Sequence, residues 1–206
     1  LPILERKFDY KGIKHSMSIS PAGIVNKEGK TIHYYPSQRE ELIEDVLRKM
    51  ACDGRGVLLD DEAGFSFSLY EVQQELKKSG HGYAIDQIKD GLHVCARSII
   101  SIQSEDGSIS LESPIFSTLG LKGVENETQT FVRFNYLVTK SIKEKTFRQL
   151  NFPKYMTHKK MLSRWLHKRL SHYFVQASKK NTYDIKLSTI VTNSGMNFHK
   201  QITNTR

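Results

Sequence analysis

Residues 68–112 decide the fold of this protein, and they read SLYEVQQELKKSGHGYAIDQIKDGLHVCARSIISIQSEDGSISLE. Residues 69–78 place apolar side chains at helical spacing behind Ser68, a residue type that caps helices. A tight turn with two glycines follows at 80–82, and a second helix is predicted over residues 83–97. Two helices joined by a short glycine turn are typical of a helix-turn-helix unit.

A β-hairpin is predicted directly after these helices. Residues 99–103 and 108–112 alternate between apolar and polar side chains around Asp106-Gly107, a strong hairpin signal. Upstream, a further helix is predicted to begin at the Ser37 cap, with Glu40 at the capping-box spacing. Three helices and a closing hairpin are the layout of a winged helix-turn-helix domain, in which the third helix is the usual candidate for the DNA major groove and the hairpin is the wing.

A second, similar series of elements is predicted near the C-terminus. Its expected elements are a helix from about 158 to 177, a strand at 183–187, a helix that begins at Ser188 and a basic helix near Asn197. Outside both series we expect strands within residues 1–36, a strand at 128–135 and a helix at about 137–144. The sequence Ser79-Gly80-x-x-Tyr83 is matched by Ser194-Gly195-x-x-Phe198 at the same place in the second series.

These patterns predict an α+β protein of tandem winged helix-turn-helix units. We expect residues 1–150 to form an N-terminal winged-helix domain with a preceding β-hairpin. Residues 151–206 are expected to form a basic second helix-turn-helix unit that is truncated at its C-terminus. The only cysteines, Cys52 and Cys95, form no C-x-x-C pair, and no apolar run is long enough to span a bilayer, so we expect a cytoplasmic protein with no membrane partner.

The net charge of +9 is divided unevenly along the chain. Residues 1–139 hold 16 Lys and Arg against 20 Asp and Glu, whereas residues 140–206 hold 15 against 2. Such a surplus indicates nucleic acid or an anionic membrane as the partner. We favour nucleic acid, because the apolar face that carries Trp165 and Leu170 has the breadth of a core rather than of a membrane anchor.

One helix of the basic third carries a stripe of positive charge. Lys160, Arg164 and Lys168 lie four residues apart on it. No acidic residue occurs between Lys145 and Asp184, whereas a plainly solvated helix face, the alternative interpretation, usually mixes both signs for ion pairing. The stripe therefore predicts contacts with phosphates, which position a protein on DNA without specifying a sequence.

Ten residues are expected to contact double-stranded DNA. They are Lys159, Lys160, Arg164, Lys168, Arg169, Lys179, Lys180, Asn197, His199 and Lys200. The last three lie on the third helix of the second unit and are expected to approach base edges, although a frayed and merely polar helix is an equal alternative. The equivalent helix of the first unit carries Asp86 and Asp90, which repel phosphates, so a contact with protein is favoured there.

Enzyme classes fit the sequence poorly. A metal-dependent nucleotidyl-transfer site would need a His-x-His pair beside a nucleophile such as Tyr34 or Tyr35, and His-x-His does not occur. No phosphate-binding loop of the G-x-x-x-x-G-K-[ST] type occurs either. His167 and His172 are five residues apart, which is off the helical spacing of metal ligands. We therefore expect no catalysis, no metal and no cofactor.

Four stretches resemble the plasmid replication initiators called RepA, which are related to the TrfA initiators. They are PSQREELIEDVLRK (36–49), FSLYEVQQEL (67–76), ETQTFVRFN (127–135) and RWLHKRLSH (164–172). The resemblance implies two winged-helix domains, binding to direct repeats in a plasmid origin, melting of adjacent DNA, and recruitment of the host initiator and the replicative helicase. It leaves a homodimer open. A winged-helix transcription regulator and a protein-partner-binding module are the alternative functions.

Overall fold

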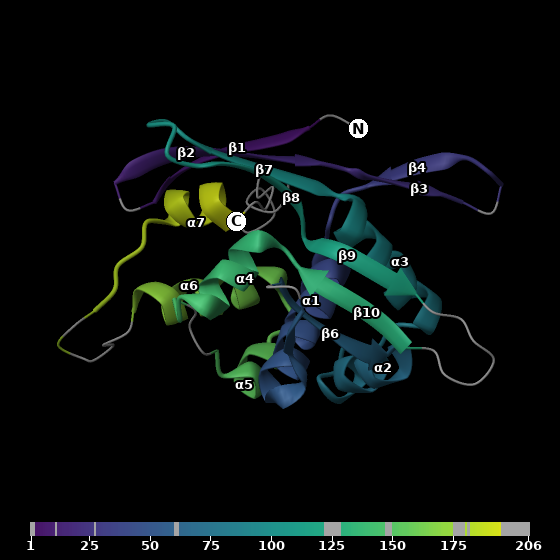
Figure 1. Ribbon diagram of the computed structural model, residues 1–206. Coiled ribbons are helices and arrows are strands. Elements are labelled where there is room, and N and C mark those ends of the chain that lie inside the picture. Colours follow the sequence, from purple (N-terminus) through teal and green to yellow (C-terminus); the bar gives the residue numbers. More distant parts are fainter. Residues whose placement is uncertain are drawn as a thin grey trace, which may run out of the picture. The chain divides into compact units, whose positions relative to one another are not determined.

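The chain forms two compact units, Leu1–Phe147 and Arg148–Arg206. The computed structural model describes residues 3–10, 12–26, 28–59, 62–121, 129–146, 150–174, 180 and 182–194 (Figure 1). The described part of the first unit contains β-sheets and helices, whereas the described part of the second unit contains helices. The protein therefore has a mixed fold of helices and strands, as the sequence predicts.

A four-stranded antiparallel sheet joins the N-terminus to the predicted hairpin. Its strands, in spatial order, are β1 (Leu4–Tyr10), β2 (Ile13–Ser20), β7 (Ile99–Ser104) and β8 (Ser110–Pro114). Met17 lies opposite Ile102, and Ile102 lies opposite Leu111, so apolar side chains share one face. The hairpin expected at 99–112 is confirmed, with Gly107 at φ 72° in its turn.

A separate two-stranded ribbon completes the N-terminal region. It consists of β3 (Ala22–Val25) and β4 (Thr31–Tyr34), which pair in antiparallel fashion. The Asn26 side chain accepts hydrogen bonds from the backbone N–H groups of Glu28 and Lys30, which shapes the connecting turn. The strands expected within residues 1–36 therefore form, and they belong to two different sheets.

Three helices form the core of the first unit. They are α1 (Gln38–Met50), which continues into the short π-helical turn η1 (Ala51–Arg55), α2 (Leu69–Lys78) and α3 (Ile85–Arg97). Ser37 and Ser68 stand at the starts of α1 and α2, each with a Glu three residues later that accepts its backbone N–H. The fully buried side chains of these helices include Leu42, Ile43, Val46, Leu47, Val72, Leu76, Ile88 and Leu92.

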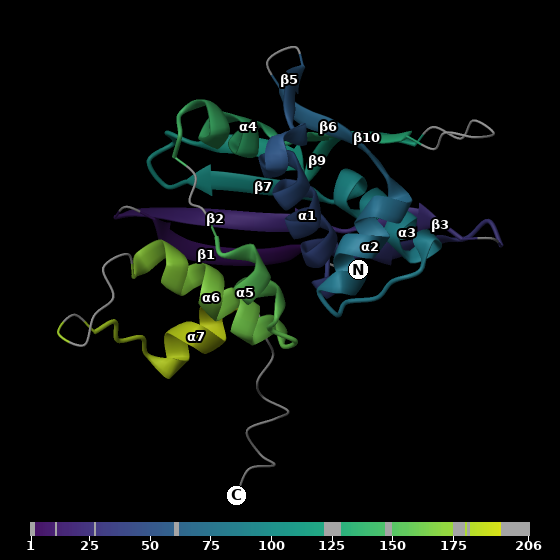
Figure 2. The ribbon, with the colours of Figure 1, turned by 90° about the horizontal axis from the view of Figure 1, so that it is seen from below.

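A second four-stranded sheet lies beside these helices (Figure 2). Its spatial order is β5 (Val57–Leu59), β6 (Glu62–Ser68), β10 (Gln129–Phe134) and β9 (Phe116–Leu121). Phe65, Phe116 and Phe134 are buried in it, with ring centroids of neighbouring pairs about 6 Å apart (6.3 and 5.9 Å). The strand before α2 thus pairs with the hairpin β9–β10, and the hairpin at 99–112, which we expected to be the wing, pairs with β2 instead.

One further helix closes the first unit. Helix α4 (Tyr136–Lys143) begins at Asn135, whose side chain accepts the N–H of Val138. The hydroxyl of Thr139 accepts the buried backbone N–H of Ala63 at 3.1 Å, which ties α4 to β6. This bond uses an N–H that would otherwise be left without a partner in the sheet.

The second unit contains α5 (Phe152–Met156), α6 (Met161–Tyr173) and α7 (Leu187–Ser194). The helix expected from about residue 158 to 177 begins at Met161 instead, because Lys160 has extended backbone angles (φ −90°, ψ 134°), and it ends at Tyr173. Helix α5 was not predicted. The strand expected at 183–187 has no regular structure in residues 183–186. The helix expected near Asn197 lies outside the described residues.

Candidate nucleic-acid interface

The positive charge of the protein belongs to its second unit. Residues 148–206 hold 12 Lys and Arg against one acidic residue, Asp184, whereas residues 1–147 hold 19 against 21. The net charges are therefore +11 and −2. A dense positive field of this kind attracts phosphates and makes the attraction dependent on salt.

Exposed lysines surround the start of α6. Lys154 on α5 and Lys159 and Lys160 between the two helices are exposed, and Lys168 on α6 is half-buried. Because no acidic residue stands in the first turn of α6, the positive end of that helix adds to the same field. We call Lys154, Lys159, Lys160 and Lys168 the α6 lysine group.

Arg164 has a different place from the one expected. Its side chain is fully buried (0% exposed), and its Nη1 donates to the backbone oxygens of His158 at 3.0 Å and Lys159 at 3.4 Å. It therefore lies beneath the surface and binds the loop between α5 and α6 instead of standing in a cationic stripe. The four-residue spacing of the sequence indicates the face of a helix on which a residue lies, but it says nothing of how deeply the side chain is buried.

Arg169 lies between two aromatic rings on α6. Its guanidinium carbon is 5.5 Å from the ring centroid of Trp165 and 4.7 Å from that of Tyr173, both within the range of cation–π attraction. Tyr173 is 51% exposed and stacks against Tyr183 with centroids 6.4 Å apart. The face of α6 that we expected to be core is therefore partly exposed, with Leu170 at 39% exposure.

Two histidines form a direct contact that the sequence did not predict. Nε2 of His158 and Nδ1 of His167 are 2.9 Å apart, and the ring of His167 meets the buried ring of Tyr155 edge-on. Burial, followed by the neighbouring charges of His158 and Lys154, lowers the pKa of His167 below its usual value. The two histidines are nine residues apart in the sequence and lie on either side of the start of α6. This separation matches neither the helical nor the strand period, so the sequence gives no signal of the contact.

The remaining predicted DNA contacts divide into two groups. Lys180 is among the residues that the structure describes, and its side chain is exposed. The predicted residues Lys179, Asn197, His199 and Lys200 lie outside the described residues.

The exposed face of α3 in the first unit is acidic. Asp86 and Asp90 are exposed, and Asp86 lies 3.8 Å from Lys89 in an ion pair. Arg97 donates to the backbone oxygen of Gly23 at 3.3 Å, which engages its charge within the fold. The exposed carboxylates of Asp86 and Asp90 repel phosphates.

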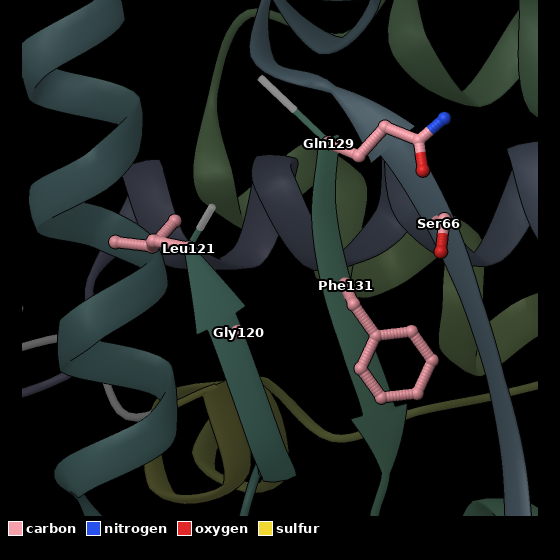
Figure 3. A pocket seen from close by; sticks show the side chains of 5 residues that line it. All are labelled: Ser66, Gly120, Leu121, Gln129 and Phe131. Atoms are coloured by element: carbon pink, nitrogen blue, oxygen red, sulfur yellow. The ribbon is translucent and has the colours of Figure 1, made fainter. Parts of the chain in front are cut away.

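A shallow depression of about 250 Å³ lies on the outer face of the sheet β6–β10–β9 (Figure 3). It is lined by Ser66, Gly120, Leu121, Gln129 and Phe131, none of which titrates. Enclosed pockets with convergent polar groups are the usual form of small-molecule sites, and this open depression lacks both properties.

The described part of the chain contains neither a cluster of metal-binding side chains nor a membrane-spanning helix. No group of three or more His, Cys, Asp or Glu side chains converges there on a common point. No helix among those residues has the length and apolar character that crossing a bilayer requires.

Comparison with known proteins identifies the fold. No protein-family model and no curated protein sequence matches this chain. A crystal structure of domains 2 and 3 of RctB, in selenomethionine form, matches with a TM-score of 0.60 at 8% identity and covers 98% of this chain and 74% of the RctB chain. A second structure of RctB domains 2–3 matches with a TM-score of 0.55 at 10% identity and covers 82% and 64%, respectively. Neither of these two structures is a RepA or TrfA initiator, and the chain shares its fold with domains 2 and 3 of RctB.

Proposed function

We propose that this chain is the DNA-binding part of a plasmid replication initiator, which binds repeated origin DNA and recruits host replication proteins. The observation that carries the proposal is the concentration of exposed lysines on a unit of net charge +11. The shared fold supports it, since RctB is a replication initiator. In this proposal the protein works in the cytoplasm by binding alone, without a catalytic step or a cofactor.

In the first unit, the proposed winged-helix domain consists of α1, β6, α2, α3 and the hairpin β9–β10. Gly80, at φ 73°, allows the sharp turn between α2 and α3. The strand between the first two helices pairs with β10 of the hairpin β9–β10, and we take this pairing as support for a winged helix. We assign the wing to β9–β10 for this reason.

In the second unit, the α6 lysine group is proposed to hold the phosphates of duplex DNA. Arg164 is a positioning residue in this account, because it binds the carbonyl oxygens next to Lys159 and Lys160 and so orders the loop that carries them. Arg169 adds a charge whose orientation Trp165 and Tyr173 hold.

The two units are proposed to have different partners. The acidic face of α3 favours a protein, either a host replication protein or a second copy of this chain, over DNA. The basic second unit favours DNA. A transcription regulator would use the same contacts, so an origin-dependent plasmid maintenance assay is needed to separate the two functions: a regulator would not sustain the plasmid.

Fluorescence anisotropy of the whole chain with labelled duplexes tests the proposal. Random and origin-derived duplexes are titrated at several salt concentrations. We expect the logarithm of affinity to fall linearly with the logarithm of salt for both, and the origin repeat to bind more tightly. Equal affinity for both duplexes would refute sequence recognition by this chain, and the absence of any salt-dependent binding would refute the DNA-binding function itself.

A further inference from the structure

The contact between His158 and His167 closes the loop between α5 and α6. His158 precedes the two exposed lysines of this loop, and His167 lies on the second turn of α6. The rings meet at 62° with their centroids 5.1 Å apart, and the facing nitrogens are 2.9 Å apart. This is the length of an N–H···N hydrogen bond, in which one nitrogen carries the proton and the other offers its lone pair.

The charges around this pair are all positive. Lys154 lies on α5, Lys159 and Lys160 lie in the loop, and Arg164 and Lys168 lie on α6. The described residues of α5, the loop and α6 include no carboxylate. Lys168 Nζ lies 5.0 Å from the ring centroid of Tyr155, which in turn packs against His167. A second imidazolium would therefore be added to an already cationic neighbourhood.

A metal ion is the weaker interpretation of this pair. Tetrahedral zinc with bonds of about 2.0–2.1 Å holds its nitrogen ligands roughly 3.3 Å apart, and a stable site needs at least a third protein ligand. Within the described residues no third His, Cys, Asp or Glu joins the two histidines. The positive surroundings also oppose a cation more strongly than they oppose a neutral pair of imidazoles.

We propose that His158 and His167 form a proton-sensitive latch, which holds the lysine-bearing loop on α6 near neutral pH and releases it when both rings are protonated. In the doubly protonated state two N–H groups and two positive charges face each other, so the hydrogen bond cannot persist. The inference concerns the conformation of the loop and does not depend on DNA binding.

The direction of the pH effect follows from His167. Because burial lowers its pKa from the ordinary 6.5, the folded protein binds this proton less readily than the unfolded chain does. The stabilisation is fully present above the unfolded value and is lost as the pH falls from about 6.5 through the folded pKa. Arg164 still holds the loop carbonyls in acid, so we expect a local loosening and not a loss of the unit.

Hydrogen–deuterium exchange of the whole chain between pH 7.5 and 5, corrected for intrinsic exchange rates, tests the latch. In the unmodified protein the backbone N–H groups of His158 and Arg164 donate to the oxygens of Tyr155 and Lys160, each at 3.2 Å, and we expect these two amides to lose roughly two- to tenfold protection, the equivalent of one net hydrogen bond. In His158→Gln, a side-chain amide that does not titrate replaces the imidazole and can still accept the N–H of a protonated His167, so the loss should become smaller. His172→Gln, on the exposed side of the same helix, should keep it.

Two results would overturn the proposal. One is protection of the amides of His158 and Arg164 that does not change with pH in the unmodified protein, and the other is an equal loss in His158→Gln. Because the His158→Gln variant could fold poorly, a second measurement uses the unmodified protein alone. A nitrogen–nitrogen coupling across the hydrogen bond should be visible by NMR at pH 7.5 and vanish at pH 5, and its absence at pH 7.5 would also refute the latch.

Discussion

Replacement of the buried Arg164 by methionine is expected to destabilise the second unit strongly. Methionine fills the space of the aliphatic stem but cannot donate to the carbonyl oxygens of His158 and Lys159. The bond to His158 at 3.0 Å has good length, so we base the expected loss on this hydrogen bond from a charged donor. Its net contribution is about 1.5–3 kcal/mol, a value that already includes the desolvation of the guanidinium.

Urea denaturation followed by tryptophan fluorescence measures this effect in the right unit, because Trp165 is the only tryptophan and lies on α6. With an m-value of about 1–1.5 kcal/mol per molar urea for a unit of this size, we expect the midpoint to fall by roughly 1–3 M. Lys160→Met is the matched control, since Lys160 is exposed and should shift stability by less than about 0.5 kcal/mol. If Arg164→Met unfolded at the same urea concentration as Lys160→Met, the structural role of Arg164 would be refuted.

Two further predictions concern the first unit, measured by urea denaturation and circular dichroism. Gly64→Ala should destabilise it by more than about 2 kcal/mol, because the added Cβ would lie 2.5 Å from the backbone oxygen of Val132. Gly120→Ala is the control and should cost less than about 1 kcal/mol, because its Cβ would have its nearest neighbour at 3.8 Å. Equal losses of stability in the two variants would contradict the packing around Gly64. Thr139→Val should cost about 1–3 kcal/mol, because the buried N–H of Ala63 loses its acceptor, and Thr139→Ser should retain most of the stability. A Thr139→Val protein as stable as the unmodified one would show that this bond contributes nothing.

The sequence predicts the helices of the first unit and one hairpin well because their signals are local. Caps such as Ser37 and Ser68, and a turn such as Asp106-Gly107, act within a few residues and were found in the structure where expected. The choice of strand partner is not local. Strand β9 and the short strand β5 were missed, and the pairing of β6 with β10 joins residues more than 60 positions apart, which no short pattern records.

The candidate interface was predicted in its charge and not in its geometry. The surplus of Lys and Arg is a property of composition, so the sequence shows it directly. The burial of Arg164 and the pairing of His158 with His167 depend on the loop between α5 and α6, whose extended Lys160 interrupts the predicted helix. Periodicity predicted a helix from about residue 158 and placed Arg164 on its exposed face.

The salt dependence of DNA binding in matched double-lysine variants tests the central claim most directly. Lys159→Ala with Lys160→Ala removes two positive charges from the α6 lysine group, and Lys77→Ala with Lys78→Ala removes two exposed charges from α2 in the first unit. If the second unit holds DNA phosphates, the slope of log affinity against log salt should become shallower by about 2 in the first variant and stay unchanged in the second. Equal slopes in the unmodified chain and the Lys159–Lys160 variant would contradict the account.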